Sequence, residues 1–544
     1  MNARAILALG LSALFFCAFV AGFSYGDVKS SVANPVHNIN TGLNYTSIQG
    51  AIDAPETVNG HTILVDSGTY NTPLVVDKSL RIIGSGRNTT VINGVGGFVV
   101  HVVARDVLIE GFSMKGGSGV LALGVYFDHS DNSVLRDNNV SGVNAGADFY
   151  GVYAAYSNNL TIDQNIIGPD SSSGILITNS LDFRVSDNYV HDNIGYGINA
   201  NASSNGLIMG NDVIGNSYDG IGLSRGCQNI TITGNTIEGP SEFGLHVIDR
   251  DCVDNVIYDN NFISNSKQAS VVSTNRWDNG VEGNFWSDYA GVDQDHDGIG
   301  DSSYGLNENN TDNYPLMGNF SVFETSLGFN VDVISNSSIA TFSYFLWNGT
   351  ITMHVKSNPL NQAFGFCRVR LSHGLMTEPY NVTVDGATPL SWNSTLYDDG
   401  GSRWIYFLYG SSNHEVLIRG RSPPPTVSII SPENKTYTVS DVPLTFTVNE
   451  ETSWLAYSLD GQSNMTISGN TTLPGVSNGT HTLVLYARNS FGDVSTSGIV
   501  YFSVSAGGLG LFPFLLATAV AIVVILVVAF VYLRKLRRRR GKNG

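Results

Sequence analysis

The sequence has few charged residues, and basic residues are especially scarce outside its C-terminal tail. Charged residues make up 14% of the 544 residues, and seven of the 28 Lys and Arg residues lie between Arg534 and Lys542. The rest of the chain therefore carries 21 basic against 46 acidic residues. A surface this acidic repels the phosphates of nucleic acids, so we expect no nucleic-acid partner.

Amphipathic helical patterning is also scarce. Long stretches with helical periodicity are hard to find, whereas Gly contributes 60 residues and Asn, Ser and Thr fill most polar positions. This composition is typical of β structure with many turns. At roughly 100–200 residues per domain, the length of the chain predicts three or more units.

Two apolar segments, one near each end, predict export and membrane attachment. Residues 1–25 have the charged start and apolar run of a signal peptide, which is either cleaved or kept as an anchor. Residues 511–533 are apolar and long enough to cross a bilayer, and the basic residues 534–544 follow at once. We therefore expect a single-pass protein with a cytoplasmic C-terminus and the bulk of the chain outside. Sixteen Asn-x-Ser/Thr triplets fit a glycosylated exterior.

One short phrase recurs between Leu80 and Trp286: an apolar residue, an Asn three positions later, and then further apolar residues. The spacing of 23–27 residues, with no helix between the phrases, predicts a solenoid. Leucine-rich repeats share this period, but their Leu-x-x-Leu-x-Leu pattern is absent, so we predict a right-handed parallel β-helix. The alignment puts one Asn in each coil: Asn138, Asn165, Asn188, Asn211, Asn235, Asn260 and Asn284.

Equivalent residues of successive coils stack at roughly 4.8 Å. An inward Asn can therefore bond to the Asn of the next coil, and we expect the seven Asn to form a structural ladder. Cys227 and Cys252 each lie eight residues before a ladder Asn. They should be neighbours, either as a disulfide or as two stacked thiols. Thr46 and Gln49 fit a capping box that opens a short helix through Ile52.

Several segments resemble known β-helix proteins. The opening of pectin-lyase-like β-helix proteins is similar to Tyr45–Ile52, Gly60–Tyr70 and Lys78–Gly84, and NosD-type members, including archaeal surface proteins, are similar to Gly283–Tyr289 and Asp312–Met317. The resemblance covers roughly residues 35–320 and implies the fold, which hosts many functions. The NosD type also implies copper delivery. Because His is scattered and only seven Met are present, we expect no copper site.

The segment Asp293–Asp301 is the sharpest local motif. Asp293, Asp295, Asp297 and Asp301 occupy the first, third, fifth and ninth positions of a loop that turns at Gly298. Hard oxygen ligands in this order resemble a calcium loop, although its twelfth position is Tyr instead of Glu. We expect a structural Ca²⁺ here, and the alternative is an acidic turn that binds nothing.

A column of glycines that open apolar triplets identifies residues on the outer surface of one sheet. Aromatic candidates for ligand binding on this surface are Tyr126, Tyr150, Tyr153 and Tyr196, and the alternative is an aromatic stack that only stabilises the sheet. Asp219, His246 and Asp249 are the candidates for catalysis. The residue sets of polygalacturonases and pectate lyases are absent, so the sequence favours a protein without enzymatic activity and leaves the question open.

Alternating strands begin after Phe323, and Pro423–Pro425 marks a stiff linker. The segment after this linker resembles immunoglobulin-like surface modules at Ser431–Tyr437 and Trp454–Gly461. The predicted fold class is all-β with a C-terminal transmembrane helix. Its parts are a signal peptide at 1–25, the β-helix at 35–320, a β-sandwich at 321–421, an Ig-like β-sandwich at 426–505, a membrane helix at 511–533 and a basic tail at 534–544.

The function predicted from these features is that of a membrane-anchored cell-surface β-helix protein that binds glycans or surface partners. One alternative is a membrane-tethered polysaccharide lyase or glycoside hydrolase, which would need Asp219, His246 and Asp249 to converge. A second alternative is a structural component of the surface layer.

Overall fold

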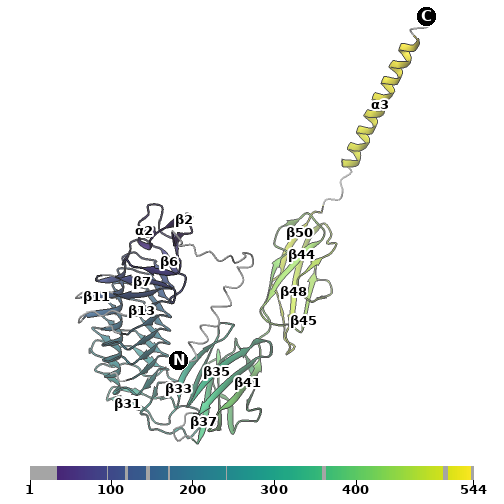
Figure 1. The fold of residues 1–544 in the computed structure, drawn as a ribbon. Coiled ribbons are helices and arrows are strands. Elements are labelled where there is room, and N and C mark those ends of the chain that lie inside the picture. Colours follow the sequence, from purple (N-terminus) through teal and green to yellow (C-terminus); the bar gives the residue numbers. More distant parts are fainter. Residues whose placement is uncertain are drawn as a thin grey trace. The chain divides into compact units, whose positions relative to one another are not determined.

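The computed structural model describes residues 34–94, 96–116, 121–141, 148–169, 172–239, 242–357, 363–506 and 512–540 (Figure 1). The predicted signal peptide lies outside the described residues. Almost all regular elements within them are strands, and the last is an apolar helix. This confirms the predicted fold class: a parallel β-helix, further β-sheets and a C-terminal helix that is a candidate membrane span.

The β-helix consists of three sheets, A, B and C, which receive one strand each from successive coils. Sheet A contains β2 (Leu43–Tyr45), β1 (Val36–Asn38), β3 (Thr62–Val65), β6 (Arg81–Gly84), β9 (Leu108–Glu110), β12 (Val134–Arg136), β15 (Thr161–Asp163), β18 (Arg184–Ser186), β21 (Leu207–Met209), β24 (Thr231–Thr233) and β27 (Val256–Tyr258). Sheet B contains β4 (Gly68–Tyr70), β7 (Thr90–Gly94), β10 (Ser113–Gly116), β13 (Asn139–Ser141), β16 (Ile166–Ile167), β19 (Tyr189–His191), β22 (Asp212–Ile214), β25 (Thr236–Glu238), β28 (Asn261–Ile263) and β30 (Phe285–Trp286).

Sheet C forms the third side of the coils. It contains β5 (Leu74–Val76), β8 (Phe98–Val102), β11 (Leu121–Asp128), β14 (Asp148–Ala155), β17 (Ser173–Thr178), β20 (Tyr196–Asn201), β23 (Asp219–Ser224), β26 (Phe243–Val247) and β29 (Lys267–Val271). Among the described strands of these three sheets, the antiparallel pairs are those of β1 with β2 and with β3. The other pairs are parallel. Because side chains alternate along a strand, each coil sends Val, Ile or Leu inward and polar residues outward. Within one coil, Val185, Val190 and Ile198 are fully buried in the shared core.

The seven predicted asparagines form a hydrogen-bonded ladder at the bend between sheets A and B. The side-chain Nδ2 of each of the first six donates to the Oδ1 of the next, over 2.8–3.2 Å. The same Oδ1 also accepts from the backbone N of the preceding ladder residue, as Asn235 does from Asn211 at 2.9 Å. All seven are 0–1% exposed, so these bonds satisfy amides that water cannot reach.

The ladder ends on a carboxylate. Asp312 Oδ2 accepts from the backbone N of Asn284 at 2.7 Å and from Trp286 Nε1 at 2.8 Å. Asp312 ends β32 (Asn310–Asp312), which pairs antiparallel with β31 (Tyr304–Asn307) after the last coil. Burial raises the pKa of Asp312 to about 6, although its hydrogen bonds act in the opposite direction.

The N-terminal end is covered by the short helix α2 (Ile48–Asp53), whose Ile48, Ala51 and Ile52 are buried. The predicted capping box is wrong in detail. The N-cap is Ser47, whose side chain accepts from the backbone N of Gly50 at 3.1 Å. Gln49 instead reaches β5, where Val75 N donates to its Oε1 at 2.8 Å, because a strand edge lies within its reach.

The residues after the β-helix form two further pairs of sheets. The first pair consists of β33 (Asn319–Glu324), β34 (Asn330–Ser335), β37 (Phe364–Ser372), β40 (Ser402–Gly410) and β39 (Ser391–Asp398), and of β35 (Ser337–Phe345), β36 (Thr350–Ser357), β41 (His414–Arg421) and β38 (Thr377–Val384), with η1 (Leu346–Asn348). The second pair consists of β42 (Val427–Ser431), β44 (Val442–Val448) and β47 (Thr471–Leu473), and of β43 (Thr436–Tyr437), β50 (Val500–Val504), β48 (Gly479–Arg488), β45 (Trp454–Leu459), β46 (Met465–Ile467) and β49 (Val494–Thr496). Inward residues of this second pair share one core.

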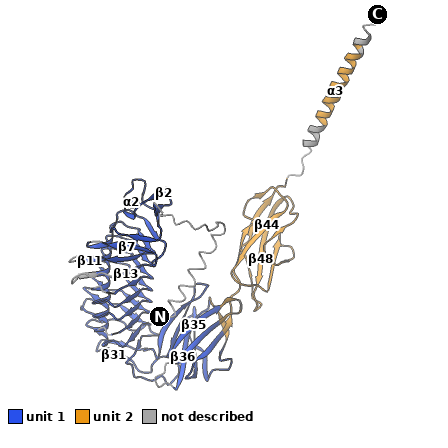
Figure 2. Ribbon diagram, in the orientation of Figure 1, with its two compact units in different colours: residues 1–344, 351–373, 381–418 blue, residues 345–350, 374–380, 419–544 orange. Residues whose placement is uncertain are grey.

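Two compact units divide the described chain (Figure 2). One comprises residues 1–344, 351–373 and 381–418, and the other residues 345–350, 374–380 and 419–544. The β-helix and most of the first pair of further sheets thus belong to one unit. The last element, α3 (Phe512–Arg540), contains a stretch from Thr518 to Lys535 that is long and apolar enough to cross a membrane, and none of it is buried.

Replacement of one ladder residue tests its contribution to stability. Asn211→Ala removes the bonds to Asn188 and Asn235 and leaves the carbonyls of Val185 and Met209 without their side-chain donor. We expect the free energy of unfolding to fall by roughly 3 kcal/mol or more, because each buried group left unpaired costs about 1–3 kcal/mol. Thermal unfolding measures this. Gln228→Ala, at an exposed site of a neighbouring coil, is the control and should change little.

The ladder's carboxylate end should make stability depend on pH. Since an unfolded Asp titrates near pH 3.9 and the folded Asp312 near pH 6, the folded state binds the extra proton between these values. Stability from this group is therefore lost as the pH rises from about 4 to about 6. Asp312→Asn keeps the acceptor oxygen without the charge, so its unfolding midpoint should fall less than that of the wild type between pH 4 and 7. Parallel profiles for the two proteins would contradict this assignment.

Candidate functional site

A row of aromatic rings lies on the outer surface of sheet C. The His101 and Tyr126 rings are stacked with centroids 4.6 Å apart, and Tyr126 and Tyr153 are stacked at 5.1 Å. Tyr150 lies against Tyr153 at 5.5 Å. All four side chains are half-buried, so one side of the row faces solvent. We call His101, Tyr126, Tyr150 and Tyr153 the ring row.

The structure thus brings three of the four predicted tyrosines together and places Tyr196 elsewhere. Tyr196 packs edge-on against Tyr218, with centroids 5.1 Å apart, and burial raises its pKa to about 12. His101 was missed because its coil has Val99 at the position where the next coil has the marker glycine, Gly124. Only the strand register between β8 and β11 pairs His101 with Tyr126.

An Asp–His pair lies further along the same surface. The carboxylate Oδ2 of Asp219 is 2.9 Å from His246 Nδ1. The Asp219 side chain is fully buried and that of His246 is 18% exposed. Burial raises the pKa of Asp219 against the lowering effect of its hydrogen bond with His246. The third candidate, Asp249, does not join them, since its Oδ2 accepts from the backbone N of Arg225 at 2.7 Å.

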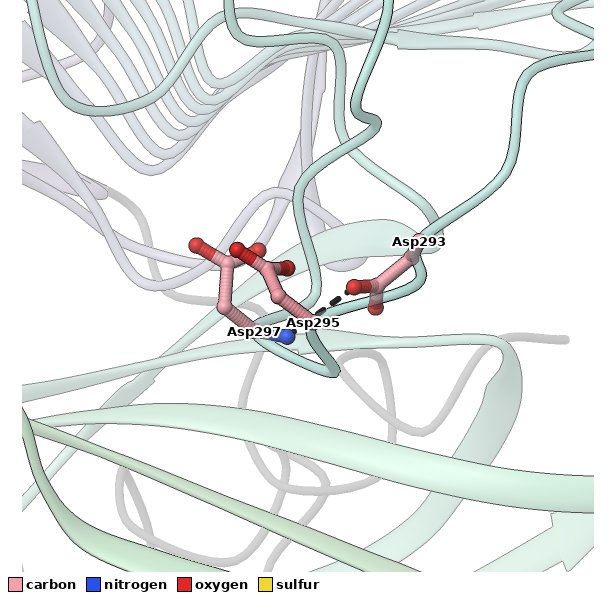
Figure 3. Close-up of side chains that lie close together, drawn as sticks. All are labelled: Asp293, Asp295 and Asp297. Carbon is pink, nitrogen blue, oxygen red and sulfur yellow. Dashed lines mark hydrogen bonds between the residues drawn. The ribbon is translucent and has the colours of Figure 1, made fainter.

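Three carboxylates of the predicted calcium loop lie close together (Figure 3). One oxygen each of Asp293, Asp295 and Asp297 can be chosen so that all lie within 4.8 Å of one another. Asp293 also accepts from the backbone N of Asp297 and Gly298 at 3.0 and 2.9 Å, which fixes the turn. Burial raises the pKa of Asp293 and of Asp297. Asp301 lies outside this group and accepts from Gln294 N at 2.8 Å.

The loop is held against β37 by Arg368, which is 3% exposed. Its Nη1 donates to the Asp297 carbonyl at 2.9 Å, and its Nε donates to Glu282 at 2.8 Å. Trp404 Nε1 donates to the same Glu282 oxygen at 2.6 Å. The acidic loop therefore rests on a buried arginine that is bonded to both Glu282 and the Asp297 carbonyl, which keeps Asp297 in position.

Cys227 and Cys252 are neighbours in adjacent coils. Both are buried free thiols in the structure, and the backbone N of Cys227 is 3.3 Å from Cys252 Sγ. They continue a column of buried serines, Ser130, Ser157, Ser180 and Ser203, in which each of the first three backbone N atoms donates to the next Oγ at 2.9–3.1 Å. Of the two predicted alternatives, the structure therefore contains stacked thiols at positions that serines fill in earlier coils.

A hollow of 430 Å³ opens near the N-terminal coils, and it is lined by none of the predicted site residues. Its walls are Asn59, Asp77, Ser79, Val103, Ala104, Arg105, His129 and Asp131. These residues come from the bends before sheet A, and the types of residue that line the hollow differ from coil to coil. The repeat pattern gave no signal for this hollow.

Three parallel sheets around one core, joined by an asparagine ladder, define a parallel β-helix protein. Residues 76–291 match the family model of NosD, described as a periplasmic copper-binding protein. This region is a NosD-like parallel β-helix, which confirms the resemblance noted in the sequence. Among the described residues, the cluster with metal-ligand spacing consists of three carboxylates, and such a donor set does not fit copper.

Proteins similar to this chain in sequence include a surface protein and a transporter-associated protein. A cell surface glycoprotein of Methanothermus fervidus is 33% identical over 122 residues, which are 22% of this chain and 20% of that protein. A probable ABC transporter binding protein NosD of Stutzerimonas stutzeri is 30% identical over 159 residues, 28% of this chain and 33% of that protein. The chain thus spans a fifth to a third of the length of these relatives. Among solved structures, the A-module of a mannuronan C-5 epimerase of Azotobacter vinelandii is 18% identical, with a TM-score of 0.30 over 42% of this chain and 76% of that one.

Proposed function

We propose that the protein is a membrane-anchored cell-surface β-helix protein that binds carbohydrate along the outer surface of sheet C. The ring row is the observation that carries this proposal. A row of flat, half-exposed rings offers apolar faces on which sugar rings stack, and the tyrosine hydroxyls and nearby carboxylates supply hydrogen bonds to sugar hydroxyls.

The charges near the ring row favour a neutral glycan over an acidic one. Asp128 Oδ2 lies 3.7 Å from His101 Nε2 and Asp128 Oδ1 lies 2.6 Å from His129 Nδ1. Burial lowers the pKa of His101 against the effect of Asp128, so its imidazole is uncharged at neutral pH. A neutral imidazole beside a carboxylate gives no attraction to a polyanion, and the net charge of −18 opposes one.

Attachment of the chain to a membrane rests on α3. Its stretch from Thr518 to Lys535 has the length and apolar character of a membrane span and is nowhere buried against the rest of the protein. Six basic residues lie between Leu533 and the end of α3 at Arg540. The positive-inside rule therefore assigns the C-terminus to the cytoplasm and the β-helix to the exterior. Similarity to a cell surface glycoprotein supports the same assignment.

We further propose that the loop at Asp293–Asp301 holds a calcium ion that stabilises the C-terminal end of the β-helix. Asp293, Asp295 and Asp297 can supply hard oxygen ligands, which suit Ca²⁺. Asp295 is exposed, and its carboxylate interacts with that of Asp293 and raises the Asp293 pKa, so a cation bound between the two offsets their repulsion.

The carbohydrate proposal predicts that loss of rings lowers retention on neutral polysaccharides. Tyr126→Ala combined with Tyr153→Ala should weaken binding by on the order of tenfold or more, since each stacked ring contributes roughly 1 kcal/mol. Retention of the purified full chain in detergent on immobilised polysaccharides measures this. Tyr189→Ala is the matched control, because Tyr189 stacks on His191 at 4.5 Å in sheet B. If the double variant loses thermal stability but retains binding, the ring row serves only the fold. If the protein instead binds no polysaccharide and forms ordered assemblies of its own, a structural surface-layer role is favoured.

The calcium proposal predicts a calcium-dependent stability. Addition of millimolar Ca²⁺ to the chelated protein should raise the midpoint of thermal unfolding, because a ligand that binds only the folded state stabilises it. Asp295→Ala should remove this increase, whereas Glu308→Ala, at an exposed acidic residue nearby in the sequence, should retain it. An equal increase in both variants would place the effect at another part of the surface.

A further inference from the structure

Asp219, His246 and Ser270 lie on three consecutive coils of sheet C. His246 in β26 pairs with Gly222 in β23 on one side and with Ser270 in β29 on the other. Asp219 begins β23, so the carboxylate and the hydroxyl belong to the strands on opposite sides of the histidine. Leu245, Val247 and Val271 point into the core, and by alternation His246 and Ser270 lie on the outer surface.

The Asp–His pair fixes which imidazole nitrogen is available for chemistry. His246 Nδ1 donates a hydrogen bond to Asp219 Oδ2 at 2.9 Å when the carboxylate is ionised. In this tautomer Nε2 is the imidazole nitrogen with a free lone pair. Asp219 is fully buried, and its Oδ1 has no hydrogen-bond partner among the described residues. A buried carboxylate that serves a half-buried imidazole orients a general base, because it holds the tautomer and stabilises the imidazolium that forms.

Ser270 is the strand neighbour of this base on the following coil. Adjacent strands of the sheet lie roughly 4.8 Å apart, so the paired side chains of His246 and Ser270 are neighbours on the same surface. Ser270 is half-buried, and no hydrogen bond joins its hydroxyl to His246 within the described residues, so the Ser270 side chain must turn toward Nε2 before it reacts. Lys267, three residues earlier on β29, is exposed, with its ammonium 5.3 Å from the Phe243 ring centroid, and adds a positive charge to this strand.

The arrangement does not suit glycoside hydrolysis. That reaction needs two carboxyls that flank the scissile bond. Asp219 is buried behind His246, and Asp249 is bonded to the backbone of Arg225. Acyl transfer instead uses a hydroxyl, an imidazole and a carboxylate in a row, which is the order of these groups across β29, β26 and β23.

We propose that Ser270, His246 and Asp219 form an acyl-ester hydrolase site that acts on acyl esters of hydroxyl compounds, such as O-acetyl groups on carbohydrate. The Ser270 Oγ adds to the ester carbonyl carbon while His246 Nε2 takes the hydroxyl proton. The carbonyl reforms, the bond to the alkoxy oxygen breaks, and His246 returns the proton to the departing alcohol. Water then adds to the acyl-serine by the same base, which releases the carboxylic acid and restores the serine hydroxyl. Ser270 and His246 are the catalytic residues, and Asp219 is a positioning residue.

This activity is separate from carbohydrate binding by the ring row. The row lies on β8, β11 and β14, and the Asp–His–Ser group lies on β23, β26 and β29. Ring-row variants should therefore retain hydrolysis of a small ester, and Ser270 variants should retain binding to polysaccharide. Failure of one proposal leaves the other testable.

The purified full chain in detergent should hydrolyse p-nitrophenyl acetate and react with a fluorophosphonate probe. Mass spectrometry of the labelled wild type should locate the probe on Ser270, a result that needs no variant. Ser270→Ala and His246→Asn should lower hydrolysis by on the order of 10³-fold or more. Ser217→Ala, at an exposed serine without an adjacent histidine column, should behave as the wild type.

Asp219→Asn tests positioning by its pH profile. Loss of the carboxylate removes stabilisation of the imidazolium, so the acidic limb of the rate profile should move to lower pH while the rate falls by on the order of 10²-fold or more. A lower rate with an unmoved limb would contradict a positioning role. A wild type that takes no label, or a label on another residue, would overturn the assignment of Ser270. Circular dichroism of each variant confirms that the fold is kept.

Discussion

The structure of the β-helix depends on one requirement: an amide buried at a bend must have all its hydrogen bonds within the protein. From Asn138 to Asn284, successive coils turn from sheet A to sheet B at a buried Asn, and the next Asn satisfies both its side chain and its backbone N. The bond sets the register between coils, because a shift of one residue would leave a buried donor unpaired. Once the register is fixed, the columns on all three surfaces follow. The stacked rings, the cysteine pair and the Asp–His pair all occupy positions that the ladder determines.

The same regularity explains what could be predicted from the sequence. The ladder asparagines, the neighbouring cysteines and the stacked Tyr126 and Tyr153 recur at the coil period, so their spacing alone placed them together. Asp249 was misplaced as a partner of Asp219 because it lies in a bend after β26, where the chain leaves the strand register. His101 was missed because its coil lacks the marker glycine. Asp312 was not recognised as the end of the ladder, since a loop and a hairpin separate it from Asn284 and no period extends across them.

Sheet C carries the two proposed sites because its outer surface combines regular spacing with variable residues. The core side of its strands consists of Val, Ile, Leu and Ala together with Phe127, whereas the outer positions contain rings near β11 and ionisable or hydroxyl groups near β26. A flat sheet presents these groups in straight columns. Binding and acid–base chemistry can therefore occupy different coils of one surface without a change in the fold.

Every Asn–Asn bond of the ladder runs in the same direction, with the donor on one coil and the acceptor on the following coil. This gives the ladder a beginning and an end that are chemically different. Asp312 accepts the last donors, as another asparagine would. The asparagine ladder therefore cannot continue into a further coil at that end, because a carboxylate occupies the position of the next asparagine. Coils between the two ends make identical bonds. Duplication or deletion of a whole coil would leave both ends of the ladder intact, so the number of coils between them can change without a change at either end.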